Sequence, residues 1–202
     1  GPTHHGVFDF GYLRMIPRSV VASPCDESEL YELLRLGLAY PGVFGIRYPK
    51  AYVPLEFSHE TKGFSIGEGE VLTEGDDLVI LTLGNMVKTG LDVAGLLKEA
   101  GIEATLCNMR FVKPLDATLL LRLAKGIKRM VVIEEHVREG GFGSAVLECL
   151  AVNNVHDVAV QLFALPNHFI EHGSRQYLLD KYCLSAETIA ESIRKDFIQC
   201  KK

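Results

Sequence analysis

The segment from Met130 to Leu150, MVVIEEHVREGGFGSAVLECL, constrains the fold more than any other part of the sequence. Four apolar residues, 130–133, predict a short buried strand that ends at the polar residues 134–136. The glycines within 140–143 allow a tight turn, and Ser144 is expected to cap an amphipathic helix. A buried strand, a polar tip, a glycine turn and a helix form one half of a parallel βαβ unit.

The same pattern recurs throughout residues 67–202, here called the C-terminal region. Further strands are predicted at 78–83, 104–108 and 158–163, and helices are expected to open at Asn85, Asp116, Ser174 and Ser185. Strands and helices that alternate in this way form a layered α/β domain with a mainly parallel sheet. We therefore predict that the C-terminal region is a complete three-layer α/β sandwich.

Residues 1–60, here called the N-terminal region, offer too few elements for a complete domain. Strands are predicted at 19–22 and 43–48, and a helix is expected to start at Asp26, with Glu29 completing a capping box. This helix carries an apolar stripe, which predicts one buried face, at Leu30, Leu33, Leu34 and Leu38. Two strands and one helix make an incomplete sheet, so we expect the end of a larger domain. The linker is predicted at 61–66, within a glycine-rich stretch that lacks periodicity.

Composition narrows the classes of partner. The chain has 202 residues, of which 48% are hydrophobic, so it can bury a substantial core. A net charge of -5 and a pI near 5.8 predict binding neither to nucleic acid nor to an anionic membrane surface. No apolar run approaches the roughly 20 residues that span a bilayer. Five widely spaced cysteines without a CxxC pair suggest a reducing compartment, and we expect a cytoplasmic protein without a zinc site.

Five sequence strings carry a resemblance to a known family. They are THHGVFDFGYLRMIP, IRYPK, MRFVKPLD, EEHVREGGFGSAV and LPNHFIEHGS, and together they extend over nearly the whole chain. In their order and spacing they resemble the C-terminal part of 1-deoxy-D-xylulose-5-phosphate synthase, a transketolase-like family that depends on thiamine diphosphate. The resemblance implies a transketolase C-terminal-like domain preceded by the end of a transketolase pyrimidine-binding-like domain.

The family's reaction is what the resemblance implies for function. Pyruvate condenses with D-glyceraldehyde 3-phosphate, carbon dioxide is lost, and the product is 1-deoxy-D-xylulose 5-phosphate, a precursor in non-mevalonate isoprenoid, thiamine and pyridoxal biosynthesis. The family forms homodimers. It holds the cofactor's diphosphate and Mg²⁺ in a domain that would precede Gly1, so we assign no cofactor-binding or metal-binding residue to this chain. The chain by itself is expected to be inactive.

Three site residues are predicted. His4 matches the family's active-site histidine, and an imidazole can donate to a developing oxyanion or shuttle a proton. Lys50 matches a position where the family usually has arginine for the substrate phosphate, and lysine supplies the charge without the bidentate fork. Arg47, on the same strand, is a candidate for the same phosphate.

Each of these residues also has a plainer interpretation. His4 could form only local hydrogen bonds in its loop, and Lys50 could be a solvated lysine at a strand end. For Arg47 we favour a structural ion pair over substrate binding. The turn at 140–144 could present amides to an anion, but the neighbouring carboxylates would repel it, and we favour a turn without a ligand.

Three hypotheses about function follow from the sequence. We favour a part of a thiamine-dependent transferase that needs further polypeptide for activity. The alternatives are a stand-alone interaction or regulatory module that dimerises through the sheet edge and helices of the C-terminal region, and an anion-binding or nucleotide-binding domain centred on 140–144.

Overall fold

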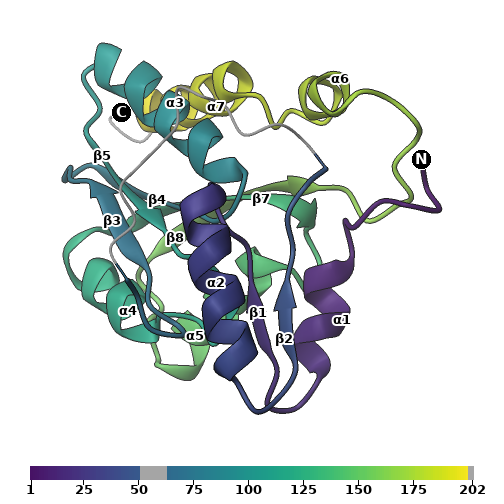
Figure 1. The fold of residues 1–202 in the computed structure, drawn as a ribbon. Helices are drawn as coiled ribbons and strands as arrows, with labels where there is room; N and C mark the ends of the chain where they lie inside the picture. Colours follow the sequence, from purple (N-terminus) through teal and green to yellow (C-terminus); the bar gives the residue numbers. More distant parts are fainter. Residues whose placement is uncertain (51–62, 200–202) are drawn as a thin grey trace.

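A five-stranded sheet forms the centre of the C-terminal region in the computed structural model, which describes residues 1–50 and 63–199 (Figure 1). The strand order is β3-β5-β4-β7-β8, and only β3 runs antiparallel to its neighbour. The strands are β3 (Glu70–Thr73), β4 (Leu78–Thr82), β5 (Ala104–Asn108), β7 (Arg129–Val137) and β8 (Ala159–Leu165).

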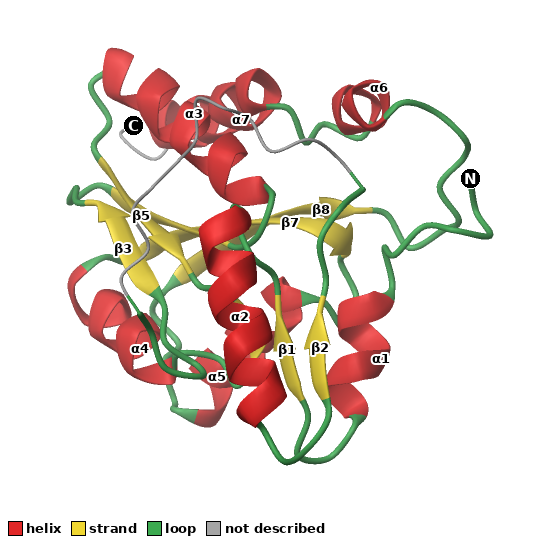
Figure 2. Cartoon of the chain, viewed as in Figure 1, coloured by secondary structure: helices red, strands yellow, loops and turns green. Residues whose placement is uncertain are grey.

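Helices cover both faces of this sheet. One face carries α3 (Met86–Glu99), α6 (Arg175–Lys181) and α7 (Ala186–Gln199), and the other carries α4 (Ala117–Gly126) and α5 (Phe142–Val152) (Figures 1 and 2). Side chains of β4 alternate between two cores: Leu78 and Ile80 pack toward α3 and α7, whereas Val79 and Leu81 pack toward α4 and α5. The predicted three-layer sandwich is confirmed.

Two strands of the C-terminal region escaped prediction. β3 is an edge strand whose four residues are all only partly buried, so it has no continuous apolar run. β6 (Phe111–Lys113) has three residues and stands directly before Pro114. Such short strands are fixed by their pairing partners, and β6 pairs with a strand of the N-terminal region.

The central strand is longer than predicted, and its helix is capped differently. β7 does not end before Glu134 but runs to Val137, because the carboxylate of Glu134 and the ring of His136 find hydrogen-bond partners in the interior. Gly141, not Ser144, is the N-cap of α5. The Ser144 hydroxyl lies inside the first turn and accepts a hydrogen bond from Gly140 N at 2.9 Å.

The N-terminal region has the two predicted strands and the predicted helix from Asp26, with a further helix before them, and one strand of its sheet comes from the C-terminal region. The elements are α1 (Asp9–Met15), β1 (Val20–Ala22), α2 (Glu27–Ala39) and β2 (Phe44–Ile46). β1 pairs in parallel with β2 and antiparallel with β6, giving the order β2-β1-β6. Asp26 caps α2 as predicted, accepting from Glu29 N at 2.8 Å, while Glu29 accepts from Cys25 N.

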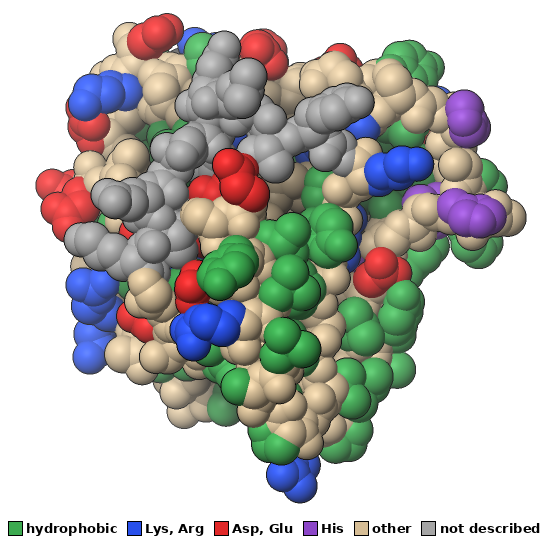
Figure 3. Space-filling view, viewed as in Figure 1, with side chains coloured by type: hydrophobic (Ala, Val, Ile, Leu, Met, Phe, Trp, Pro, Cys, Tyr) green, Lys and Arg blue, Asp and Glu red, His purple; other side chains and the backbone are tan. Residues whose placement is uncertain are grey.

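The buried face of α2 is smaller than predicted. Leu33 is fully buried, but Leu34 is 51% exposed and Leu38 is 90% exposed. Hydrophobic side chains accordingly gather on the surface over α2 and β2 (Figure 3). The helix rests on β1 and β2 through Leu33, and Leu30 is partly buried, whereas Leu34 and Leu38 lie on the surface of the described structure. The predicted linker, 61–66, begins among residues 51–62, which lie outside the described residues.

Candidate functional site

A cavity of about 480 Å³ lies where the first residues of the chain meet the ends of β2 and β7 and the start of α6. All three predicted site residues, His4, Arg47 and Lys50, line it. Glu135 and Arg175 of the C-terminal region line it as well. The structure therefore brings the predicted residues together at a junction between the two regions of the chain.

The two adjacent histidines of the first loop have different environments. The Nε2 atom of His5 accepts from Ile170 N at 3.3 Å, and its ring packs between Phe8 and Phe169 with centroids 5.5 and 6.0 Å away. His4 is exposed, and its side chain has one hydrogen bond within the described part of the chain, from Nδ1 to the Thr3 hydroxyl at 2.9 Å. His5 thus anchors the loop, and the exposed His4 is among the residues that line the cavity.

The loop before α1 is fixed to the end of β7. Val137 N donates to Val7 O at 2.9 Å, and Gly11 N donates to His136 Nε2 at 3.2 Å. The other ring nitrogen of His136 bonds Val137 O at 2.7 Å, so the neutral tautomer with Nδ1 protonated satisfies both contacts. Burial lowers the pKa of His136, which favours that neutral form. Phe10 stacks on the ring with a centroid distance of 5.3 Å.

The helix N-terminus considered as an anion site already holds a carboxylate of the chain itself. Glu134 accepts from Phe142 N at 2.7 Å and from Gly143 N at 2.9 Å. Its side chain is fully buried, and burial raises the pKa of this carboxyl to about 7. The turn is further held by Arg14, which donates to the carbonyls of residues 140 and 141. The anion-binding hypothesis for 140–144 is therefore not supported.

Arg47 has a rigid backbone and an incompletely paired side chain. Arg47 N donates to Ala22 O at 2.9 Å, and its carbonyl accepts from Ser23 Oγ at 2.7 Å. Among the described residues the guanidinium donates once, to Glu135 O at 2.8 Å, and it lies 5.2 Å from the centre of the Phe10 ring. Burial lowers the pKa of Arg47, and the nearby Glu135 charge opposes that effect.

The favoured structural ion pair of Arg47 does not form within the described residues. No carboxylate oxygen of residues 1–50 or 63–199 lies within 4.0 Å of its guanidinium nitrogens. The prediction failed because the strand end directs the guanidinium at a main-chain carbonyl, which accepts a hydrogen bond but carries no full charge. Arg47 therefore keeps a charge and further N–H donors at the cavity.

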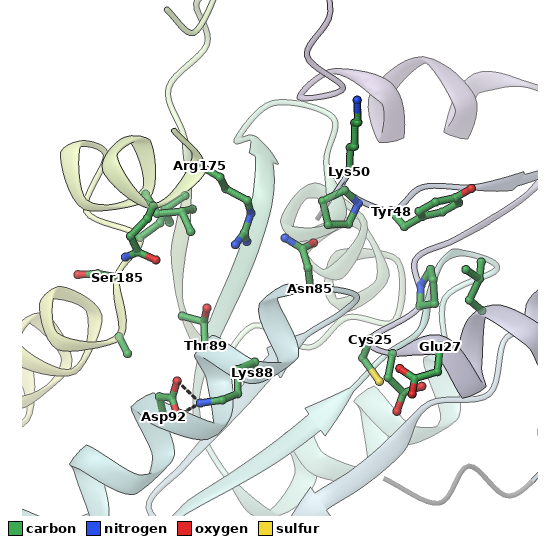
Figure 4. A pocket seen from close by; sticks show the side chains of 18 of the residues that line it. Cys25, Glu27, Tyr48, Lys50, Asn85, Lys88, Thr89, Asp92, Arg175 and Ser185 are labelled. Carbon is green, nitrogen blue, oxygen red and sulfur yellow. Dashed lines mark hydrogen bonds and ion pairs between the residues drawn. The ribbon is translucent and has the colours of Figure 1, made fainter. Parts of the chain in front are cut away.

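Lys50 stands between two cavities. A second cavity of about 640 Å³ lies between the start of α2, α3 and α6, and it shares Lys50 and Arg175 with the first (Figure 4). The Lys50 side chain is exposed and has no hydrogen-bond or ion-pair partner among the described residues. A free ammonium group at this position supplies a positive charge that an anion entering either cavity would meet.

Two further polar residues of the site were not predicted from the sequence. Arg175 lines both cavities, and Asn85 lines the larger one. Arg175 binds both carboxylate oxygens of Glu135, and the side-chain amide of Asn85 donates to the same carboxylate. Asn85 could have been found, because it follows β4 and Glu135 lies near the end of β7. Adjacent parallel strands bring such residues to one edge of the sheet. Arg175 lies on a short helix far along the chain, and no local pattern marks it.

Among residues 1–50 and 63–199, no group of three or more His, Cys, Asp or Glu side chains is placed to hold a metal ion. Within the same residues, no helix has the length and apolar character needed to cross a bilayer.

Family models match both regions of the chain. The transketolase C-terminal domain matches residues 67–189, and the transketolase pyrimidine binding domain matches residues 1–55. The chain therefore belongs to the transketolase family. Within it, the similar curated proteins are 1-deoxy-D-xylulose-5-phosphate synthases, which confirms the resemblance seen in the sequence.

These relatives are longer than the chain. The synthase of Heliobacterium modesticaldum is 42% identical over 96% of this chain and 30% of its own length, and that of Gloeobacter violaceus is 45% identical over 96% and 31%. A solved structure described as a split gene transketolase, inactive beta4 tetramer, is 31% identical with a TM-score of 0.88, over 96% of this chain and 63% of that one. The chain spans about a third of the length of the curated relatives that it matches.

Proposed function

We propose that the chain is the C-terminal part of a thiamine diphosphate-dependent 1-deoxy-D-xylulose-5-phosphate synthase. In this reaction pyruvate and D-glyceraldehyde 3-phosphate condense, carbon dioxide is released, and the product serves isoprenoid, thiamine and pyridoxal biosynthesis. The observation that carries the proposal is the meeting of His4, Arg47 and Lys50 at one cavity. The similarity to the bacterial synthases over nearly the whole chain supports it.

Each of the three residues has a role in this proposal. The His4 imidazole exchanges a proton with an oxygen of the reacting carbonyl group, a role that histidine side chains commonly have in catalysis. Arg47 and Lys50 bind the phosphate of D-glyceraldehyde 3-phosphate. The Arg47 guanidinium offers two parallel donors, whereas the Lys50 ammonium acts as a point charge. Two cations without carboxylate partners in the described structure suit a phosphate dianion.

The described residues do not fit the diphosphate of the cofactor or its metal. The amides at the start of α5 are occupied by Glu134, and residues 1–50 and 63–199 contain no cluster of potential metal ligands. We infer that thiamine diphosphate and Mg²⁺ are bound mainly by polypeptide outside residues 1–202. If the cofactor and its metal are bound there, the chain is inactive by itself.

We also propose that the enzyme is a homodimer. Eight of the twelve exposed large hydrophobic side chains among the described residues belong to residues 1–50, including Leu38 and Met15. Exposed apolar clusters of this kind are typical of association surfaces. The split-gene relative described as a beta4 tetramer supports self-association in this family. The exposed hydrophobic side chains lie mainly in the N-terminal region, which favours a dimer contact there. The module hypothesis instead placed the contact in the C-terminal region.

A cytoplasmic location is part of the same proposal. The cysteines at positions 25, 107, 149 and 183 are free thiols. Free thiols are the usual state of cysteine in reducing compartments.

The proposal is tested with a chimeric enzyme. The segment of the Heliobacterium modesticaldum synthase that aligns with this chain is replaced by residues 1–202, and product formation is followed with both substrates, thiamine diphosphate and Mg²⁺. We expect the chimera to form 1-deoxy-D-xylulose 5-phosphate. His4→Ala should lower its kcat/KM by roughly 10²-fold to 10⁴-fold, the range for loss of a general acid or base.

Two controls accompany the chimera. His156→Gln removes an exposed imidazole that does not line the cavity, and it should reduce the rate far less than His4→Ala. The unfused chain, with its intact mass of 22.3 kDa verified, is assayed in parallel and should give no product. Turnover by the unfused chain, or equal rates for the chimera and its His4→Ala variant, would contradict the proposal.

A further inference from the structure

The charged groups that line the 480 Å³ cavity differ in how they are paired. Three carboxylates and three cations line it, namely Asp9, Glu135, Glu171, Arg47, Lys50 and Arg175. Glu171 is engaged by Lys181 and by a tyrosine hydroxyl, and Asp9 accepts from Tyr12 at 2.5 Å. Glu135 is the residue among these whose main chain Arg47 contacts, so the placing of its carboxylate bears most directly on Arg47.

Glu135 lies beside Arg47 but does not neutralise it. The main-chain carbonyl of Glu135 accepts from Arg47 Nη2 at 2.8 Å. Of the charged groups that shift the pKa of Arg47, Glu135 has the largest effect on that pKa. Its carboxylate nevertheless stays beyond ion-pair distance of the Arg47 guanidinium, because it is directed toward Arg175.

Arg175 engages the whole carboxylate of Glu135. Arg175 Nε lies 2.9 Å from Oε1, and Nη2 lies 2.9 Å from Oε2, which is the bidentate geometry of strong arginine–carboxylate pairs. Asn85, the residue directly before α3, donates to Oε2, and the Arg175 and Asn85 side chains point toward one another (Figure 4). The Glu135 side chain is 15% exposed and that of Arg175 is 38% exposed, so the carboxylate is the more buried partner of the pair.

We propose that Arg175 is a positioning residue that holds the Glu135 carboxylate away from Arg47, so that Arg47 and Lys50 stay available to the phosphate group of a phosphorylated aldehyde. This inference rests on the proposed function and assigns the phosphate selectivity of the cavity to a residue of α6. Without Arg175, the freed carboxylate is attached to the residue that Arg47 already contacts. It would pair with Arg47 and repel a phosphate dianion.

The test measures binding of inorganic phosphate and of D-glyceraldehyde 3-phosphate to the purified 202-residue chain by isothermal titration calorimetry, with unphosphorylated D-glyceraldehyde as the reference ligand. Arg175→Gln should weaken binding of both phosphate ligands by roughly ten- to a hundredfold, the value of one or two charge-assisted hydrogen bonds. Binding of D-glyceraldehyde should be unchanged. Glu135→Gln alone should tighten phosphate binding, because it removes the competing carboxylate and frees Arg175.

The double variant Arg175→Gln/Glu135→Gln separates positioning from a structural role. It should recover phosphate affinity to within about threefold of the unaltered chain, since no carboxylate remains to compete for Arg47. A double variant as weak as Arg175→Gln overturns the inference, as does weaker phosphate binding by Glu135→Gln. Weaker phosphate binding by Glu135→Gln overturns the inference even if the Arg175→Gln variant does not fold. An unaltered chain that binds neither phosphate ligand would refute the proposed phosphate site itself, and the inference with it.

Discussion

The N-terminal and C-terminal regions carry similar apolar patterns, but they bury them to very different degrees. In α3 of the C-terminal region, Val87 and Leu97 are fully buried and the remaining apolar stripe packs against the same core. In α2 of the N-terminal region, Leu33 is fully buried whereas Leu38 is 90% exposed. An apolar stripe therefore indicates which face a helix offers for packing. It does not indicate whether the same chain supplies the surface that covers that face.

The junction of the two regions is more tightly built than either sequence pattern suggested. Glu29 of α2 accepts from Arg110 Nε at 2.5 Å and from Asn108 Nδ2 at 2.8 Å, and both charged side chains are buried. The Arg110 guanidinium also lies 4.4 Å from the centre of the Phe64 ring. With β6 pairing to β1, this cluster attaches the incomplete region to the complete one.

The largest effect is expected from breaking that junction. Arg110→Met leaves the Glu29 charge buried without its cation, so the free energy of unfolding should fall by about 3 to 5 kcal/mol in urea denaturation. The double variant Glu29→Gln/Arg110→Met removes the orphaned charge and should recover much of that loss. A decrease below about 1 kcal/mol for Arg110→Met would mean that the pair behaves like a surface ion pair, and the two regions are joined mainly by strand pairing.

A second test sharpens the contrast within a single helix. Leu33→Ala should lower the free energy of unfolding by about 2 to 5 kcal/mol, because it opens a cavity between α2 and its sheet. Leu38→Ala should change it by less than about 0.5 kcal/mol. Leu38→Glu is instead expected to shift the chain toward monomer in analytical ultracentrifugation. If Leu38→Ala destabilises as much as Leu33→Ala, residue 38 is covered within the monomer, and the contrast drawn here is wrong.

A third test concerns the pH dependence of the C-terminal region. The pKa of Glu134 is raised from 4.5 to about 7 by burial, so the folded state holds this proton more tightly than the unfolded state. The contribution to stability is then fully present below pH 4.5 and is lost as the pH rises through 7. The free energy of unfolding, relative to that of Glu134→Gln, should fall by about 3 kcal/mol across this window. A difference that is constant with pH would show that Glu134 does not titrate there.

Sequence reasoning recovered most of the C-terminal fold, because its strands and helices each satisfy a local rule. β5 was predicted residue for residue, and the Asp116 cap of α4 is present as a hydrogen bond to Leu119 N. β3 and β6 were missed because they are short and depend on pairing with distant strands. The end of β7 was missed because a carboxylate and an imidazole continue a strand only when the interior supplies partners for them.

The candidate site, like the fold, was predicted only in part from the sequence. His4, Arg47 and Lys50 were named from the sequence, and they line one cavity, although their roles in binding and catalysis remain predictions. The pairing of Glu135 with Arg175 was not foreseen, because it joins the end of one strand to a helix on a later connection.

The sequence by itself determined the α/β class, the family, the caps at Asp26 and Asp116, and the residues that could carry chemistry, since these depend on local periodicity and recognisable strings. Only the tertiary structure decided which charges are free. The Arg47 guanidinium has no carboxylate partner among the described residues, whereas Arg175 is paired with Glu135, because contacts between distant elements set which carboxylate each cation can reach. The sequence fixes how many charged groups there are, but pairing depends on distance, which only the folded chain defines.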